Sequence, residues 1–431
     1  MKFRKIQIFS ILLLPCILFA AGLEVRPVRT STLNPQILSR IDQLVQKGLN
    51  AKAFPGCQVL VLKDGKIVYD RSFGFYTYEG NQKVTSETLY DVASLTKVAG
   101  TLLAVMKLYD AGKLRLEDKA SSFLPFLKNT NKENITIRQL LLHETGLPPS
   151  LNLNRMVTTK DPLHQLLFGS TFYRDSLVSR CYTVNFGLQV SDSLWLRNDL
   201  HEVAMNQIAQ MPLGRPTYLY SCVNFMLLKE VIESIAGEPM NEFLNREFYA
   251  PMGLRNTAFH PLTLHDKLEI APTLSRDFLR DGMVQGFVQD PDAALLGGVS
   301  GNAGLFSTSS DVAKIFQLFL YDGVVDGVRY LKAETCKLFT TTTSDTKRRA
   351  LGFDKSVPSN PKHSPCSIST PASVYGHTGY TGTCCWVDPD HKMIYVFLSN
   401  RTYPNDGVNK LARMNIRTDI QELLYQSIKE K

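Results

Sequence analysis

The sequence contains only one long apolar run, and this excludes a membrane protein with several spanning segments. The run covers residues 6–20 of the 431-residue chain. Internal repeats and low-complexity segments are also lacking, and the composition excludes a disordered chain, a collagen and a coiled coil. Hydrophobic residues make up 44% and charged residues 20% of the chain, as in soluble globular proteins. This length predicts two or three lobes, or one large domain with an insertion.

Clustered positive charge is scarce as well. The chain has 48 basic and 40 acidic residues, and the formal net charge of +8 includes three charges from Lys2, Arg4 and Lys5. The basic residues are scattered, apart from a short cluster at residues 347–349 (KRR). This pattern lacks the footprint of a nucleic-acid-binding protein, so we expect no nucleic-acid partner.

Metal-binding spacings are absent too. No Cys-x-x-Cys pair occurs, and His201-Glu202 lacks the second histidine of a zinc-protease helix, so we predict no metal and no cofactor. Without Cys16 the eight cysteines fall to an odd number, and Cys384 and Cys385 are adjacent. We therefore expect no full disulfide framework, although export would permit one bridge.

The N-terminus has the pattern of a secretory signal. A basic start precedes the apolar run, and Ala20-Ala21-Gly22 provides small residues for cleavage. We predict a signal peptide at residues 1–21 and export to the periplasm or cell envelope. An uncleaved anchor is the alternative, and Cys16 after Pro15 fits a lipoprotein cleavage site poorly.

Both ends of the remaining chain, residues 22–431, combine a helix with strands. Apolar residues at helical spacing predict helices at residues 35–51 and 416–428. Two β-rich runs flank Asp64-Gly65, a strong hairpin signal, and a further β region spans residues 385–398. The fold class is therefore α+β, with one antiparallel sheet built from both termini and covered by the terminal helices.

The middle of the chain is expected to form a second lobe. We place the sheet lobe at about residues 35–93 and 305–431, and an all-helical lobe at about 94–304. Within the second lobe, residues 151–210 show weak periodicity and are interpreted as an insertion. Its predicted helices include residues 99–111, which end at Gly112.

Three short motifs carry candidate chemistry. Ser94 and Lys97 are one helical turn apart, so a desolvated, partly neutral lysine could accept the serine proton. A Ser94 N–H at a helix start would be free to stabilise an oxyanion. Tyr220, beside an ammonium, could act as a general base. His377-Thr378-Gly379-Tyr380 enters the C-terminal strands, where the Tyr380 N–H could be a second oxyanion donor.

Together with their flanks, these motifs resemble the serine β-lactamase and penicillin-binding protein superfamily, especially its class C-like branch of D-alanyl-D-alanine carboxypeptidases and esterases. The similarity extends over about residues 35–430, apart from the insertion. The stretches that carry it are TLYDVASLTK (88–97), ITIRQLLLHETGL (135–147), DPDA (290–293), GGVSGNAGLFST (297–308), GHTGYTGT (376–383), Asp388-Pro389 and Asn400-Arg401.

The resemblance implies a serine β-lactamase/DD-peptidase fold and a role for each matched position. Ser94 is implied as the acylated nucleophile, Lys97 as its proton shuttle, and Tyr220 as the base and then the acid. His377 stands where many members carry the lysine of Lys-Thr-Gly, which weakens the expectation of an efficient β-lactamase. We expect His377 to donate one hydrogen bond and to become cationic at mild acidity.

Cys222 departs furthest from the family pattern, because the matched position is usually asparagine. A thiol cannot both donate and accept as an amide does, so Asn224 or water would have to replace part of that network. We assign Cys222, His377, Thr378, Gly379 and Tyr380 to substrate binding. A catalytic thiol is the alternative for Cys222, and a small buried residue is the simpler one.

The function that follows from the resemblance is acyl transfer through a Ser94 ester. We expect a DD-carboxypeptidase-like enzyme acting on peptidoglycan peptides. The alternatives are an esterase for small acyl esters, a weak class C-like β-lactamase, and a non-catalytic protein that keeps the fold. The substrate is a small molecule or a peptide stem, and the sequence does not indicate the oligomeric state.

Overall fold

The computed structural model describes residues 33–159, 172–277, 279–280 and 282–428. The predicted signal at residues 1–21 lies outside these ranges. In the described part of the chain, every helix is too short or too polar to cross a membrane.

The helices and strands follow one another along the whole chain. The helices are α1 (Pro35–Leu38), α2 (Arg40–Asn50), α3 (Leu103–Asp110), α4 (Ile137–Leu142), α5 (Asn154–Val157), α7 (Leu200–Gln210), α8 (Cys222–Ala236), α9 (Met240–Leu244), α10 (Pro291–Leu295), α11 (Ser309–Leu320), α12 (Ala333–Thr341), α13 (Lys410–Arg413) and α14 (Ile416–Ser427). The strands are β1 (Gly56–Lys63), β2 (Lys66–Gly74), β3 (Tyr90–Asp91), β4 (Thr158–Thr159), β5 (Phe172–Tyr173), β6 (Val178–Ser179), β7 (Leu188–Ser191), β8 (Leu194–Leu196), β9 (Phe306–Ser307), β10 (Val324–Val325), β11 (Val328–Arg329), β12 (Asp354–Lys355), β13 (Tyr375–Thr378), β14 (Cys384–Asp388) and β15 (Met393–Ser399).

Strands from both ends of the chain form one six-stranded antiparallel sheet, as the sequence predicts. Its order is β12-β13-β14-β15-β1-β2, so β15 pairs directly with β1. The predicted hairpin joins β1 to β2 through Asp64 and Gly65, which both have positive φ values (53° and 77°). Paired positive φ values are those of a type I′ turn, whose twist matches that of the two strands.

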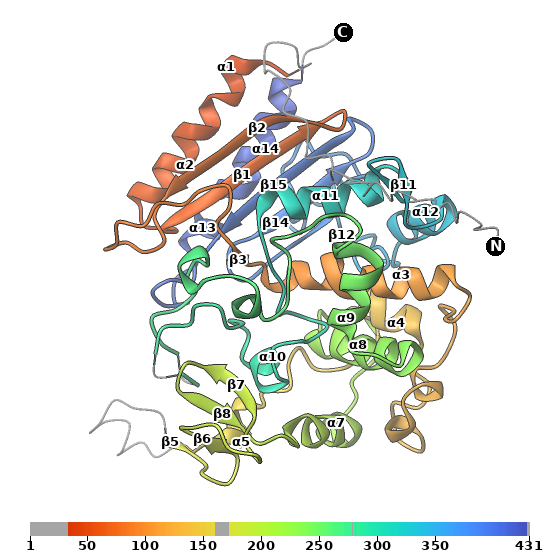
Figure 1. Cartoon of the computed structure of the whole chain (residues 1–431). Coiled ribbons are helices and arrows are strands. Elements are labelled where there is room, and N and C mark those ends of the chain that lie inside the picture. Colours follow the sequence, from red (N-terminus) through yellow and green to blue (C-terminus); the bar gives the residue numbers. More distant parts are fainter. Residues whose placement is uncertain (1–32, 160–171, 278, 281, 429–431) are drawn as a thin grey trace, which may run out of the picture.

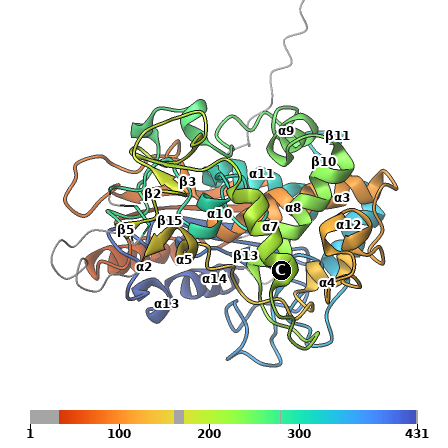
Figure 2. The same cartoon turned by 90° about the horizontal axis from the view of Figure 1, so that it is seen from below.

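Both faces of this sheet are buried. Val59 and Val61 of β1 pack toward the terminal helices, whereas Leu60 and Leu62 pack into the central core. Successive side chains of a strand point to opposite faces, which explains why all of β1 is buried and why most of its residues are apolar. Helices α1, α2 and α14 cover one face, and α11 covers the other (Figures 1 and 2). The terminal helices therefore cover only one of the two faces.

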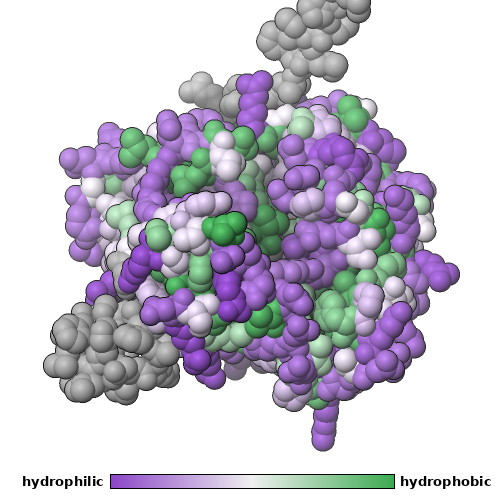
Figure 3. All heavy atoms as spheres, turned by 60° about the horizontal axis from the view of Figure 1, so that its bottom comes forward, coloured by the Kyte–Doolittle hydropathy of each residue, from purple (hydrophilic) through white to green (hydrophobic). Residues whose placement is uncertain are grey.

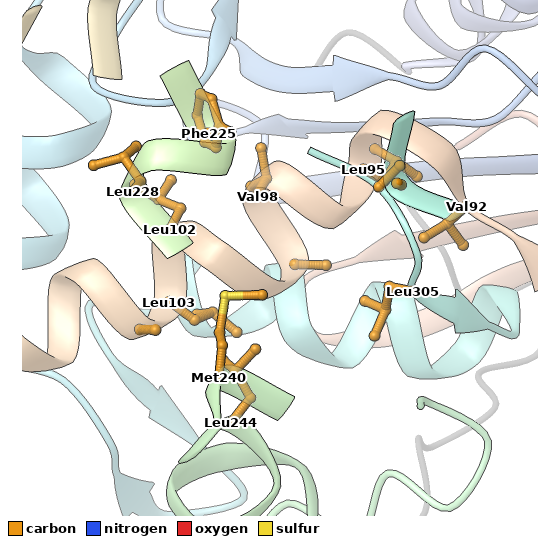
Figure 4. Packing of buried hydrophobic residues seen from close by; sticks show 14 of the residues in the cluster. Val92, Leu95, Val98, Leu102, Leu103, Phe225, Leu228, Met240, Leu244 and Leu305 are labelled. Carbon is orange, nitrogen blue, oxygen red and sulfur yellow. The ribbon is translucent and has the colours of Figure 1, made fainter. Parts of the chain in front are cut away.

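The second lobe packs against the α11 side of the sheet. Its core joins the helical segment after Ser94 to α8 and α9, and Leu102, Phe225 and Met240 belong to one buried cluster (Figure 4). A π-helical segment, Lys97–Leu102, precedes α3, and Gly112 follows with a φ of 68° at the predicted end.

The second lobe is not all-helical, and that part of the prediction is wrong. The insertion contains strands β4 to β8, which form a two-stranded and a three-stranded sheet at the bottom of Figure 1. These strands are two to four residues long, too short for an alternating pattern to stand out in the sequence. Asp292 holds the start of the insertion, because its carboxylate accepts the backbone N–H groups of residues 151–153.

Candidate active site

The turn before Ser94 is strained and firmly held. Ala93 has a φ of 48°, which is uncommon for a residue other than glycine. The buried carboxylate of Asp91 accepts the Ala93 N–H at 2.8 Å and the Gln289 N–H at 2.7 Å. Burial raises the pKa of Asp91 to about 6, although these two bonds favour its charged form. Strained backbone that several surrounding contacts hold in place is frequent at functional sites. Here these contacts fix the position of Ser94.

Two side chains, those of Lys97 and Tyr220, converge on the Ser94 hydroxyl. The Lys97 Nζ donates to Ser94 Oγ at 2.9 Å, and the Tyr220 hydroxyl donates to the same oxygen at 3.0 Å. Tyr220 is 126 residues further along the chain and comes just before α8. One hydroxyl, one amine and one phenol are thus in direct contact, so two groups that can carry a proton lie within hydrogen-bond reach of the candidate nucleophile.

The protonation states differ from one of our expectations. Burial alone would lower the pKa of Lys97, but Cys222 and Tyr220 raise it above its ordinary value. Burial also raises the pKa of Tyr220 despite the opposing effect of Lys97. The expectation of a partly neutral Lys97 is therefore wrong: the resting pair is an ammonium and a neutral phenol. Because both pKa values are raised, the Lys97–Tyr220 pair loses a proton only above neutral pH.

Cys222 lies in the site and contacts the lysine. The Lys97 Nζ is 3.5 Å from its sulfur and also donates to the backbone carbonyl of Asn302 at 2.9 Å. Desolvation raises the pKa of the thiol in spite of the nearby Lys97, which disfavours a catalytic thiolate, and the residue as a whole is only partly buried. Asn224 does not replace the missing amide, because its side chain bonds Thr145 and His143.

His377 is held within the protein. Only 2% of the residue is exposed, and its Nδ1 donates to the Thr378 carbonyl at 2.7 Å. The Nε2 then accepts from Nη1 of Arg349, 3.4 Å away. Burial lowers the pKa of His377 to about 3, and Arg349 and Lys97 act in the same direction against Asp354. The expectation that His377 becomes cationic at mild acidity is wrong, because the buried ring has a cation beside it.

Arg349 and Asp354 lie beside the candidate site and were not predicted from the sequence. Arg349 is fully buried and forms an ion pair with Asp354, which also pairs with Arg348 at 3.0 Å. Burial would raise the pKa of Asp354, but the two arginines hold it well below its usual value. The cluster at residues 347–349 was the only sequence signal, and nothing in it shows that two arginines turn toward one carboxylate.

The β13 strand ends against the turn that carries Ser94. A side chain on Gly379 would meet the Thr383 hydroxyl at 2.0 Å and the Val92 carbonyl at 2.6 Å, so only glycine fits this approach. Thr383 donates to the Val92 carbonyl at 2.9 Å, which fastens the two segments together. Thr378 precedes this contact, and Tyr380 follows it with 52% of its surface exposed. The backbone N–H groups of Ser94 and Tyr380 donate to no group in the described residues, so both are free for an oxyanion.

A cavity of about 330 Å³ lies beside residues 297–306, away from the Ser94 side chain. Its wall includes Gly297, Gly298, Phe306 and residues 187–190 of the insertion, but none of the converging side chains at Ser94. Figure 3 shows the face at the bottom of Figure 1, where hydrophobic residues gather around a central hollow in a hydrophilic surface. Among the described residues, the seven cysteines are unpaired and no group of histidine, cysteine and carboxylate residues is arranged for a metal.

Comparisons with known proteins agree with this geometry. The family model described as Beta-lactamase matches residues 41–416. A protein of Escherichia coli (strain K12), provisionally named D-alanyl-D-alanine carboxypeptidase, is 30% identical over 99% of this chain and 100% of its own. The N-acetylmuramyl-L-alanine amidase of Bacillus subtilis (strain 168) is 28% identical over 94% of this chain and 92% of its own.

Solved structures show the same fold at lower identity. The hydrolase EstCE1, described as having promiscuous acyltransferase activity, superposes with a TM-score of 0.63 at 20% identity, covering 90% of this chain and 99% of its own. A class C beta lactamase superposes with a TM-score of 0.62 at 17% identity, covering 91% of this chain and 98% of its own.

Proposed function

The chain belongs to the Beta-lactamase family, and from this we propose that it is an exported serine hydrolase that removes the terminal D-alanine from peptidoglycan peptides. The observation that carries the proposal is the convergence of Lys97 and Tyr220 on the Ser94 hydroxyl. The two curated relatives support the substrate class, because both are named for amide bonds of peptidoglycan components. The basic and apolar N-terminus supports export.

In the proposed reaction, Ser94 Oγ attacks the carbonyl carbon of the D-alanyl-D-alanine bond. The hydroxyl proton passes to the Lys97–Tyr220 pair, after that pair has lost one proton, and then to the leaving amine as the C–N bond breaks. The backbone N–H groups of Ser94 and Tyr380 stabilise the oxyanion. Water then attacks the Ser94 ester by the same proton path, which releases the shortened peptide and regenerates the hydroxyl.

One observation favours an esterase as the second candidate. Carboxypeptidase substrates and β-lactams carry a carboxylate, which the lysine of Lys-Thr-Gly would meet. Here His377 is neutral and both of its ring nitrogens are engaged within the protein. Small acyl esters do not need that cation, whereas β-lactams and D-alanyl-D-alanine peptides both lose a partner for their carboxylate.

The test is to assay the purified protein side by side on a pentapeptide ending in D-Ala-D-Ala, a nitrophenyl ester and a chromogenic cephalosporin. Release of D-alanine that is lost in Ser94→Ala supports the carboxypeptidase, and Ser94-dependent hydrolysis of the ester alone supports the esterase. A fluorescent penicillin that labels the wild type but not Ser94→Ala demonstrates the acyl-enzyme. No turnover of any substrate, together with no labelling, would instead indicate a non-catalytic protein.

A further inference from the structure

A buried histidine outside the converging triad lies directly against Tyr220. His143 follows α4 with a left-handed φ of 58° and has no exposed surface. Its ring centroid is 4.6 Å from that of Tyr220 and 5.3 Å from that of Phe225, so the imidazole lies near both aromatic rings. The mechanism above does not use His143.

The hydrogen bonds around His143 fix which nitrogen carries the proton. Thr145 donates its hydroxyl proton to Asn224 Oδ1 at 2.7 Å, which turns the Asn224 amide nitrogen toward His143 Nδ1 at 3.2 Å. The Ser221 N–H also donates to Nδ1, at 3.1 Å. Because Nδ1 accepts twice, the ring proton lies on Nε2, which has no partner among the described residues.

The imidazole is therefore a neutral support. Burial, together with Arg349, Lys97 and His377, holds the pKa of His143 well below its ordinary value. Its Nδ1 holds the peptide between Tyr220 and Ser221, and its ring limits tilting of the phenol. The other groups that face the Tyr220 ring are Lys97 at 5.2 Å and Arg349 at 5.8 Å, with His377 on a third side.

We propose that His143 is the positioning residue of Tyr220: its Nδ1 acceptor and its ring keep the phenol within reach of both Ser94 and Lys97. This inference rests on the proposed function. It predicts that removal of the acceptor displaces Tyr220, slows the attack of Ser94 and weakens the influence of Lys97 on the phenol. Misplacing a catalytic group by about 1 Å is enough to lower a rate by about 100-fold.

Two substitutions separate the acceptor from the ring. His143→Phe keeps a ring but removes Nδ1, which leaves the Ser221 N–H without its acceptor. His143→Asn loses the ring but offers Oδ1 close to the place of Nδ1, and asparagine tolerates the left-handed backbone. The measurement is the rate of Ser94 labelling by a fluorophosphonate, which needs an activated serine but no carboxylate recognition, recorded from pH 6 to 10.

Labelling should be about 10- to 100-fold slower in His143→Phe, and its rate should rise with pH only at higher pH than in the wild type. In His143→Asn both the rate and its pH dependence should return most of the way to those of the wild type. The matched control is His391→Phe, because the His391 ring also lies near a tyrosine ring, at 5.8 Å, but bonds the Asp388 carboxylate in the β14–β15 turn. Its labelling rate and pH profile should equal those of the wild type.

Equal rates and pH profiles in folded His143→Phe and wild type would overturn the positioning role and leave the proposed function intact. If His143→Phe does not fold, the decision falls to His143→Asn. If folded His143→Asn is labelled at the wild-type rate, and the rate rises with pH over the same range, the acceptor role is supported. If its rate falls about 10- to 100-fold and rises only at higher pH, although Oδ1 replaces the acceptor, the acceptor role is overturned. A wild type that is not labelled at Ser94 would overturn the proposed function and the positioning role together.

Discussion

Two buried cations flank the Tyr220 ring, and the protein holds them in opposite ways. Lys97, beside the nucleophile, is held by neutral acceptors: Ser94 Oγ, Cys222 Sγ and the Asn302 carbonyl. Arg349, at the β12–β13 edge of the sheet, is paired with the carboxylate of Asp354. The acceptors around Lys97 include a hydroxyl that can exchange a proton with it, whereas the buried Arg349–Asp354 ion pair keeps both of its charges fixed. The comparison teaches that the first region is arranged for proton transfer and the second for a permanent charge.

The largest expected effect is on the rate of Ser94 acylation when Lys97 is replaced. Lys97→Ala should slow Ser94 acylation by about 1,000-fold, since positioned proton transfer contributes about 10²- to 10⁴-fold. Its thermal unfolding should change little, because no buried carboxylate loses its ion-pair partner. Labelling with a fluorescent penicillin and a melting curve measure the two quantities. Acylation at the wild-type rate would remove the proton-shuttle role.

At Asp354 the large expected effect is on the free energy of unfolding rather than on activity. Asp354→Ala leaves Arg349 buried without its anionic partner, and loss of such a partner costs about 3–5 kcal/mol of unfolding free energy. Urea denaturation at pH 7 measures the change, with Asp406→Ala on the surface as the control.

The same carboxylate gives a pH signature with a defined sign. Because the folded pKa of Asp354 is depressed, its contribution is present above the unfolded value of about 3.9 and is lost as the pH falls below it. The stability difference between wild type and variant should therefore shrink in acid. An undiminished difference at pH 3 would contradict the ion pair as its cause.

The pH dependence of acylation should follow the lysine–tyrosine pair. Both groups have raised pKa values, so the base form appears only as one proton leaves the pair, and the rate should rise by about tenfold per pH unit on the alkaline side of neutrality. His377 should add no transition between pH 5 and 8, since its pKa lies near 3. A rate that is flat from pH 6 to 10 would contradict this assignment of protonation states.

The smallest expected effect is at Cys222. Cys222→Asn should leave the melting temperature nearly unchanged and raise β-lactam turnover by less than about tenfold, because a single uncharged hydrogen bond contributes about 0.5–1.5 kcal/mol. Cephalosporin hydrolysis and a melting curve test this expectation. A variant that misfolds would show that the thiol is required for packing beside Lys97.

Local features of the fold could be predicted because neighbouring residues decide them. The β1–β2 turn follows from Asp64-Gly65, and the spacing of Ser94 and Lys97 follows from one helical turn. The small strands of the insertion could not be predicted, since their stability comes from packing rather than from a repeating pattern. The burial of Arg349 could not be predicted either, because the basic cluster at residues 347–349 does not show which of its side chains turns inward.

The sequence by itself determined which groups are available: a serine and a lysine one turn apart, a tyrosine before a helix and a glycine that permits close approach. Only the tertiary structure decided that Tyr220, 126 residues from Ser94, reaches the same hydroxyl. It also decided that Lys97 is charged and His377 neutral. The physical reason is that a pKa depends on burial and on charges a few ångströms away, which the folded chain brings from distant segments.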